Sequence, residues 1–196
     1  MSDVHCNAEA FERAVAEMAP EVDEILLMGD AVYEYRFSNE VVGGARRLGL
    51  RYVLGNHEMV LLGPHGERAR SAPTVDPANL AYLRDVPTRI DVRLGGKQVC
   101  MVHGSPWAPY DEYLHAGSKT LARCADLEAD ILLLGHTHVP MVQRVGHTLV
   151  VNPGSLGESR EPRPDRPVSY AVLDTESEEV EVRRFPNPRF AAATPS

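Results

Sequence analysis

The stretch Ile131–His138, which reads ILLLGHTH, is the most informative part of this 196-residue chain for its fold. Four consecutive large aliphatic residues are typical of a buried strand, and the run ends in two histidines spaced one residue apart. Open α/β sheets form their binding crevice where the strands end. The stretch therefore predicts an α/β layered fold in which a buried strand delivers imidazole ligands to the edge of a sheet.

Three other apolar runs end in the same kind of side chain. They are residues 24–28 (EILLM) before Gly29-Asp30, residues 51–54 (RYVL) before Gly55-Asn56-His57, and residues 99–102 (VCMV) before His103. Another histidine, His5, follows Asp3 by two residues near the N-terminus. Because strand ends meet at one edge of such a sheet, we expect these side chains to converge. The predicted metal ligands are Asp3, His5, Asp30, Asn56, His103, His136 and His138.

This set of ligands is too large for one metal ion. Seven side chains that mix imidazole with carboxylate and amide oxygen fit two first-row divalent ions sharing a carboxylate. No thiolate is among them, which disfavours a structural zinc site. We therefore expect two divalent ions, with manganese favoured and with iron, zinc, nickel and magnesium as alternatives.

Helical patterns alternate with these apolar runs, as in a layered α/β domain. The sequence predicts helices over 8–19, 38–48, 76–85 and 118–129, a hairpin over 89–102 that turns at Gly95-Gly96, and strands over 141–145, 148–151, 168–173 and 180–184. We expect a single domain over residues 1–185. Residues 186–196, rich in proline and alanine, are predicted to be a flexible tail.

The composition limits the kinds of binding partner and the cellular location that we expect. The formal net charge is -8, and a broad acidic surface disfavours extended nucleic acid as a partner. No apolar run approaches the roughly 18 residues of a membrane span, so no membrane partner is expected. The three cysteines, Cys6, Cys100 and Cys124, are widely spread, which suggests reduced thiols in a soluble cytoplasmic protein. A small-molecule substrate is compatible with this composition, and the formation of a homo-oligomer is left as an alternative.

Five short blocks of the sequence resemble a known family. SDVHCN (2–7), MGD (28–30), GNHE (55–58), VHGS (102–105) and GHTH (135–138) are similar, in this order, to the signature blocks of the calcineurin-like metallophosphoesterase superfamily. NPGSLGESR (152–160), followed by SYAVLD, resembles the bacterial and archaeal phosphodiesterase branch. The resemblance implies two mixed β-sheets in a sandwich flanked by helices, with a two-metal centre at one edge.

The resemblance also implies a role for each residue. Asp3, His5 and His138 would bind the first metal, Asn56, His103 and His136 the second, and Asp30 would bridge them. His57 matches the residue beside the leaving group, while Asn56 and Arg160 would contact the substrate. The implied reaction is hydrolysis of a phosphodiester by a hydroxide shared between the metals. A phosphomonoesterase acting on a nucleotide or a phosphoprotein, and a non-catalytic scaffold with the same fold, remain alternatives.

Two departures from the family pattern are visible. The family has a strand before its Asp-x-His block, whereas only Met1-Ser2 precede Asp3 here, so we expect an open sheet and a poorly held Asp3. Cys6 stands where the family usually has glycine, and we expect it to be tolerated without binding metal. The aromatic residues of SPWAPYDEY, which are Trp107, Tyr110 and Tyr113, either line a pocket for a nucleobase or form a loop that packs on its own domain.

Overall fold

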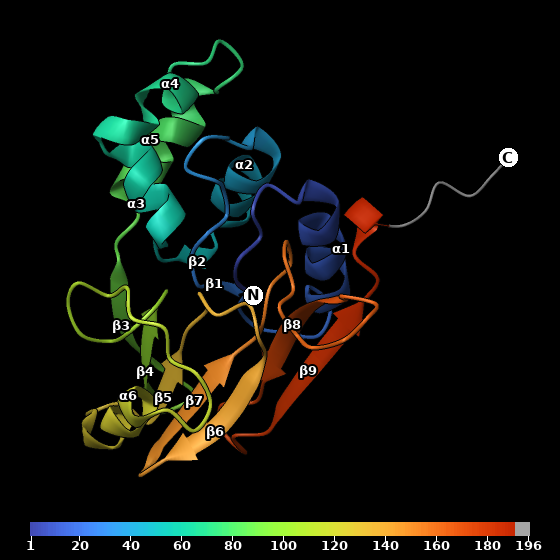
Figure 1. Ribbon diagram of the computed structural model, residues 1–196. Helices are drawn as coiled ribbons and strands as arrows, with labels where there is room; N and C mark the ends of the chain where they lie inside the picture. The colour runs from blue at the N-terminus through green and yellow to red at the C-terminus, as the bar shows by residue number, and fades with distance from the viewer. Residues whose placement is uncertain (191–196) are drawn as a thin grey trace, which may run out of the picture.

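A five-stranded mixed sheet lies at the centre of the computed structural model, which describes residues 1–190 (Figure 1). Its order is β3-β4-β5-β7-β6, with β4, β5 and β7 parallel and an antiparallel strand at each edge. The strands are β3 (Arg89–Leu94), β4 (Lys97–Val102), β5 (Ile131–Leu133), β6 (Met141–Val145) and β7 (Thr148–Asn152). The α/β class predicted from the sequence is confirmed.

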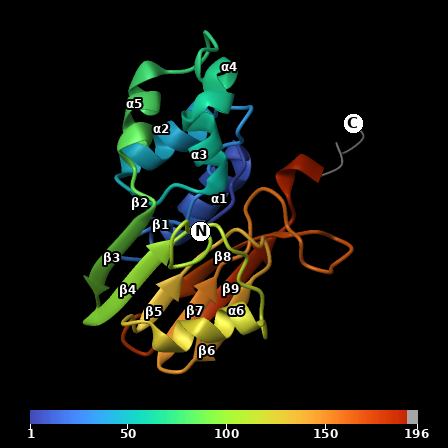
Figure 2. The same cartoon turned by 60° about the vertical axis from the view of Figure 1, so that its left-hand side comes forward.

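The central strand β5 is buried on both faces, which explains its continuous apolar run. Leu132 and Leu134 pack into one hydrophobic cluster with Leu121 and Cys124, from the segment that covers one face of the sheet. Ile131 and Leu133 belong to another cluster, which includes side chains of the strands on the opposite face. Figure 2 shows the short helix α6 (Lys119–Ala122) lying across the first of these faces.

Two smaller sheets complete the strands. β1 (Leu26–Leu27) and β2 (Arg51–Tyr52) form a parallel pair, and β8 (Val168–Leu173) and β9 (Val180–Phe185) form an antiparallel pair. The predicted calcineurin-like α/β architecture is confirmed, and within residues 1–190 its strands form three hydrogen-bonded sheets, of which the five-stranded one is mixed. The apolar runs at 24–28 and 51–54 each pair over only two residues before the backbone turns towards glycine.

The helices gather mainly above the strands in Figure 1. They are α1 (Ala8–Met18), α2 (Asn39–Leu48), α3 (Asn56–Leu62), α4 (Glu67–Arg70) and α5 (Pro77–Asp85), together with the 3-10 turns η1 (Pro64–Gly66), η2 (Arg123–Asp126) and η3 (Pro188–Phe190). The predicted helices over 8–19, 38–48 and 76–85 are confirmed. The helix predicted over 118–129 is shorter and continues as η2. The prediction omitted α3 and α4, which glycines and Pro64 break into short pieces.

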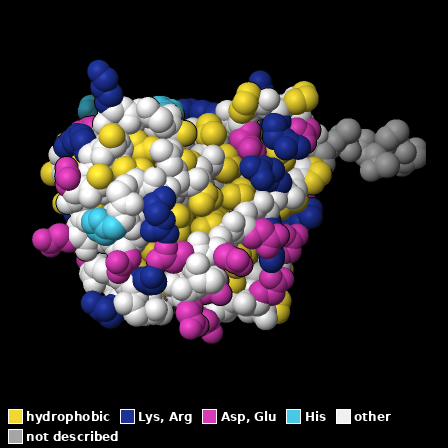
Figure 3. Space-filling view, turned by 90° about the horizontal axis from the view of Figure 1, so that it is seen from below, with side chains coloured by type: hydrophobic (Ala, Val, Ile, Leu, Met, Phe, Trp, Pro, Cys, Tyr) yellow, Lys and Arg dark blue, Asp and Glu magenta, His cyan; other side chains and the backbone are white. Residues whose placement is uncertain are grey.

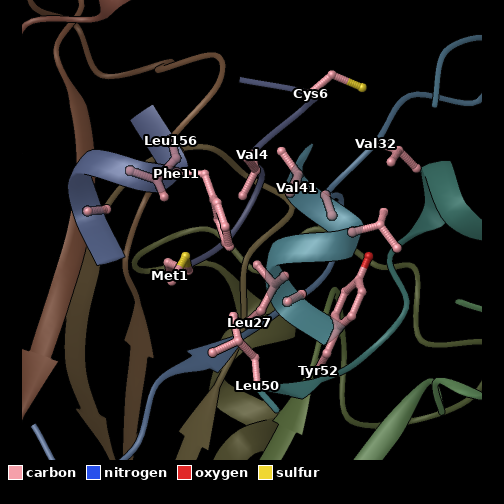
Figure 4. Packing of buried hydrophobic residues seen from close by; sticks show 14 of the residues in the cluster. Met1, Val4, Cys6, Phe11, Leu27, Val32, Val41, Leu50, Tyr52 and Leu156 are labelled. Atoms are coloured by element: carbon pink, nitrogen blue, oxygen red, sulfur yellow. The ribbon is translucent and has the colours of Figure 1, made fainter. Parts of the chain in front are cut away.

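The largest hydrophobic cluster packs α1 and α2 against the N-terminal segment (Figure 4). Phe11 of α1 is 2% exposed and lies among Val4, Leu27 and Val41. A Cβ atom at Gly44 would lie 2.7 Å from the Phe11 ring, so this glycine leaves room for the ring beside α2. The packing therefore accounts for a helix that runs through Gly43-Gly44 despite their low helix propensity.

Part of the predicted C-terminal tail is ordered. Asn187 is buried, accepts a hydrogen bond from Asn7 Nδ2 and donates one to the carbonyl of Gly157. The Arg189 guanidinium donates to the carbonyl of His5. The prediction of a flexible tail was therefore wrong for residues 186–190, because polar side chains between the prolines bind the backbone of distant segments. Residues 191–196 of the predicted tail lie outside the described residues.

The lower side of the molecule carries a cluster of apolar side chains (Figure 3). A hollow of about 500 Å³ lies between β1 and β8, where its lining includes Met1, Met28, Leu133, Val151 and Leu173. Within residues 1–190, no helix is both long and apolar enough to cross a bilayer.

Candidate metal centre

All seven predicted ligands come together at the carboxyl ends of β1, β2, β4 and β5. His103 Nε2 lies 3.1 Å from Asp30 Oδ2, from Asn56 Oδ1 and from His136 Nδ1. His138 Nε2 lies 3.2 Å from Asp3 Oδ1 and 3.1 Å from His5 Nε2. The convergence expected from the strand ends is therefore observed in the fold.

The charged and imidazole side chains form two overlapping groups. One contains Asp3, His5, Asp30 and His138, and the other contains Asp30, His103 and His136. Within each group the ligand atoms lie within 4.8 Å of one another. Asp30 belongs to both groups, and Asn56 Oδ1 lies beside the second of them through its contact with His103. Each group could hold one metal ion.

The chemistry of these donors fits cations. Asp3 Oδ1 is buried and makes no hydrogen bond within residues 1–190, a costly arrangement for a carboxylate oxygen without a cation. His5 Nε2 faces His138 Nε2 at 3.1 Å, and two ring nitrogens in such contact can share at most one proton. Cations between these atoms would satisfy the carboxylate and the imidazole lone pairs together.

Hydrogen bonds on the far side of three imidazoles set their orientation. His103 Nδ1 donates to the carbonyl of Met28, and His138 Nδ1 donates to the carbonyl of Glu158, each at 2.7 Å. His136 instead donates from Nε2 to the carbonyl of Asp111 at 3.1 Å. Such outer partners fix the tautomer, so that Nε2 of His103 and His138 and Nδ1 of His136 face the centre.

Asp3 is firmly held, so the expectation of a poorly held residue was wrong. Its amide donates to the carbonyl of Gly29 at 3.0 Å, and its Oδ2 accepts from the His136 amide at 3.0 Å. Its carbonyl accepts from the Gly157 amide at 2.8 Å and from Ser155 Oγ at 2.7 Å. The loop at 155–157 supplies support that the local sequence around Asp3 does not reveal.

The backbone at the centre is strained. Five of the predicted ligands have a positive φ, namely Asp3 (53°), His5 (47°), Asp30 (53°), His136 (68°) and His138 (60°). The left-handed conformation costs about 1 kcal/mol or more for a residue with a side chain, and such residues cluster at functional sites. Gly55 permits a further close approach, because a Cβ atom there would lie 2.1 Å from Asp30 Oδ1.

The pKa values of the imidazoles and carboxylates at the centre shift with burial and with one another. Burial opposes a positive imidazole, but the Asp30 carboxylate raises the pKa of His103 to about 10. Burial works against the Asp30 carboxylate too, yet His103 holds the pKa of Asp30 below its usual range. Burial lowers the pKa values of His5 and His136 to about 4, which keeps both rings in the neutral form that binds metals.

Glu58 is a buried residue whose role was not predicted. Its carboxylate accepts hydrogen bonds from the amides of Asp30 (2.9 Å), Val32 (3.1 Å) and Gly55 (2.8 Å) and from the Tyr52 hydroxyl (2.9 Å). It thereby ties the turn after β1 to the start of α3. The sequence carries half of a signal for it, since a glutamate three residues after the N-cap accepts from the N-cap amide in a capping box, as Glu58 does from the Gly55 amide.

His57 lies at the open side of the centre. Its amide donates to Asp30 Oδ1 at 3.0 Å, its Nε2 lies 3.8 Å from Asp30 Oδ2, and its side chain is 25% exposed. Its Nδ1 contacts the Glu34 carboxylate, a partner that sequence reasoning missed. Arg160 is near the centre through its backbone, which donates to the carbonyl of His138 at 3.1 Å, but its side chain is exposed.

The side chains of Cys6 and Trp107 contact other parts of the protein, and neither is assigned a role in metal or substrate binding. Cys6 Sγ donates to the carbonyl of Arg36 at 3.3 Å, and burial raises the pKa of its thiol to about 11. Trp107 donates to Glu112 at 2.8 Å, and the Arg123 guanidinium lies 3.8 Å above its ring. Trp107 therefore packs within its own domain, which was the second of the two alternatives for this loop. The ring of Tyr113, by contrast, stacks on the ring of His136.

Comparison with known proteins shows the family. Residues 1–178 match the family model of the calcineurin-like phosphoesterase superfamily domain. The chain belongs to this superfamily. Members of this phosphoesterase superfamily use divalent metals, in keeping with the two groups of ligands.

Individual proteins also align with much of the chain. Protein MJ0912 of Methanocaldococcus jannaschii is 26% identical over 94% of this chain and 85% of its own length. The probable metallophosphoesterase YsnB of Bacillus subtilis is 28% identical over 58% of this chain and 66% of its own length. The crystal structure of a metallophosphoesterase from Sphaerobacter thermophilus, 28% identical, superposes with a TM-score of 0.73 over 94% of this chain and 86% of that one.

Proposed function

We propose that this superfamily member is a two-metal phosphodiesterase. The observation that carries the proposal is the convergence of seven ligands in two groups that share Asp30. Asp3, His5 and His138 would hold the first metal, Asn56, His103 and His136 the second, and Asp30 would hold both. Manganese(II) suits this mixture of imidazole, carboxylate and amide ligands without thiolate.

The bound cations would supply the Lewis acidity that activates a water molecule and offsets charge on the phosphoryl oxygens. The protein contributes the fixed geometry of the ligands. Five of these ligands have a strained backbone, and the buried Glu58 holds the amides of Asp30 and Gly55 in place. Asn56 begins α3 beside the second group, where its amide could also contact the substrate.

His57 is the proposed proton donor to the leaving oxygen. Its Nδ1 is held by Glu34, so its Nε2 is the ring nitrogen free to act on the side of Asp30. General acid catalysis needs a side chain at hydrogen-bond distance from the leaving group, and partial exposure lets substrate approach this ring. We also propose that Arg160, on the exposed loop after His138, contacts the substrate.

Charge favours a diester over a monoester. The Glu34 carboxylate contacts His57, the Glu158 carboxylate bonds to the Tyr33 hydroxyl, and the molecule as a whole carries a formal charge of -8. A phosphomonoester carries about 1.5 to 2 negative charges at neutral pH, whereas a diester carries one. A monoesterase acting on a nucleotide or phosphoprotein is the second candidate. The complete ligand set with His57 weighs against a non-catalytic scaffold.

The test is a comparison of two chromogenic esters. Metal-free protein is loaded with Mn(II) and assayed on bis-p-nitrophenyl phosphate and p-nitrophenyl phosphate. We expect metal-dependent hydrolysis of the diester with a higher kcat/KM than for the monoester. Hydrolysis of the monoester alone would indicate that the protein is a phosphatase and not a phosphodiesterase. Two bound metals without hydrolysis of either ester would support the scaffold.

Replacement of His57 by alanine should lower kcat on bis-p-nitrophenyl phosphate by about 10²-fold or more, the usual contribution of a general acid. Glu34→Gln keeps the imidazole but loses the charged partner of Nδ1, and we expect a loss of about tenfold, as for other residues that orient a catalytic imidazole. Metal content, measured by mass spectrometry, should stay at two ions in both variants. Equal kcat in His57→Ala and the natural protein would contradict the assigned role.

We also place the protein in the cytoplasm. Its three cysteines are buried and free, as expected where thiols stay reduced.

A further inference from the structure

His5 is held differently from the other imidazoles among the predicted ligands. Its Nδ1 is buried and has no hydrogen-bond partner within residues 1–190, whereas His103, His136 and His138 each donate to a backbone carbonyl. Such outer hydrogen bonds fix the orientation of a ligating imidazole. His5 also has a positive φ of 47°, a conformation that persists only where the surrounding structure enforces it. Other contacts must therefore hold this ligand in place.

Both polar groups of the His5 backbone are bonded. Its amide donates to the carbonyl of Asp30 at 2.9 Å, and its carbonyl accepts from the Arg189 guanidinium. One face of its ring is covered by Tyr33, with ring centroids 4.8 Å apart. Asp30 and Tyr33 belong to the turn after β1, whereas Arg189 belongs to the C-terminal segment, which we define as residues 187–190. Arg189 therefore fixes the peptide group that follows the His5 side chain.

Asn187, in the same segment, joins two other parts of the chain. Its Oδ1 accepts from Asn7 Nδ2 at 3.1 Å, and its Nδ2 donates to the carbonyl of Gly157 at 3.0 Å. Asn187 is 3% exposed, so water cannot replace these two hydrogen bonds when they are lost. Asn7 follows His5 by two residues. Asn187 therefore ties the segment after His5 to the loop that contains Gly157.

The loop at 155–158 contacts two further ligands of the proposed first metal. Its Gly157 amide donates to the carbonyl of Asp3 at 2.8 Å, and its Glu158 carbonyl accepts from His138 Nδ1 at 2.7 Å. The C-terminal segment thus reaches three ligands of the first site, one directly and two through this loop. Within residues 1–190, its side chains make no hydrogen bond to Asn56, His103 or His136, which are the ligands proposed for the second metal alone.

We propose that Asn187 and Arg189 are positioning residues for the first metal site. This inference rests on the assignment of the ligands to two sites in the proposed function. Both residues act through the backbone that presents Asp3, His5 and His138, and neither is itself a ligand. The expected consequence is asymmetric, because loss of either side chain should weaken metal binding at the first site and leave the second site unchanged.

Calorimetric titration of the metal-free protein with Mn(II) tests this asymmetry without any substrate. His136→Ala removes a ligand of the second site, so the ion that still binds tightly reports on the first site, and His5→Ala gives the reverse case. In the His136→Ala protein, we expect Asn187→Ala and Arg189→Ala each to raise the Kd for Mn(II) by about 10- to 100-fold, the usual cost of losing an outer partner of a metal ligand. In the His5→Ala protein, the same two changes should leave the Kd unchanged.

Matched variants separate positioning from a general loss of stability. Arg189→Lys keeps a cationic donor for the His5 carbonyl and should restore most of the affinity. Arg93→Ala removes an exposed arginine that likewise donates to a backbone carbonyl, that of Gly96 at 2.9 Å, and it should leave the Kd unchanged. Asn79→Ala removes another buried asparagine, from α5, and should lower the Tm without changing the affinity for Mn(II).

The outcomes separate this inference from the proposed function. An equal loss of affinity in the His136→Ala and His5→Ala proteins would overturn the inference, because a general disturbance of the fold weakens both sites. Unchanged affinity of the first site in Asn187→Ala and Arg189→Ala would overturn it as well. A natural protein that binds two ions but hydrolyses no diester would overturn the phosphodiesterase alone and leave the positioning role standing, since the titration needs no turnover.

Discussion

Replacing Asp30 by alanine should empty at least one metal site and lower kcat on bis-p-nitrophenyl phosphate by about 10³-fold, since electrostatic stabilisation at the phosphorus would be lost. Asp30 is the one residue shared by both ligand groups, with Oδ2 at 3.1 Å from His103 Nε2 and 4.0 Å from His5 Nε2. Its Oδ1 also accepts from the His57 amide, so the variant loosens the proposed acid as well.

Metal content measured by mass spectrometry and calorimetric titration with Mn(II) would check this result. Asp165→Ala is the matched control, because Asp165 is exposed and pairs only with Arg163 in the described part of the chain. An Asp30→Ala protein that still binds two ions with unchanged affinity would contradict the assignment of Asp30 as the shared ligand.

Replacing Glu58 by alanine should destabilise the metal-free protein by about 3–5 kcal/mol, because several buried donors would lose their acceptor at a cost of about 1–3 kcal/mol each. Three backbone amides and the Tyr52 hydroxyl would lose their acceptor in an interior where water cannot replace it. For a chain of this size the loss corresponds to a fall in Tm of about 10 °C. Glu58→Gln retains one carbonyl acceptor and should lose about half as much.

Thermal unfolding followed by circular dichroism would measure this effect, with Glu12→Ala as the control for an exposed glutamate. Metal-free samples matter here, because bound metals would add their own stabilisation to the folded state. A Tm for Glu58→Ala within about 2 °C of the natural protein, equivalent to less than about 1 kcal/mol, would contradict the role of Glu58 in holding the two turns together.

The helical layer shows where sequence reasoning was sufficient and where it failed. Ser38 and Asp76 cap α2 and α5 as their positions predict, because a cap depends on residues only two or three positions away. By contrast, α3 and α4 are interrupted by Gly63-Pro64 and Gly66, so neither has a long enough periodic pattern to be recognised. Their existence depends on packing against the rest of the helical layer.

The side chains of the candidate metal centre were predictable from the sequence itself. Histidines, aspartates and an asparagine that follow apolar runs are chemically distinctive, and the topology of an α/β sheet brings such strand ends to one edge. That reasoning named Asp30, Asn56, His103, His136 and His138, with His57 beside them, whereas Asp3 and His5 were recognised by their spacing of two residues near the N-terminus.

Only the tertiary structure decided what holds each of these residues. His103 is oriented by the carbonyl of Met28, His138 by that of Glu158 and His136 by that of Asp111. Every residue has a backbone carbonyl, so these partners leave no mark in the sequence. The contact of Glu34 with His57 and the stacking of Tyr113 on His136 depend likewise on how separate loops fold over the centre. The sequence determined which groups can bind metal, and the packing of distant loops decided their orientation and the aromatic surfaces around them.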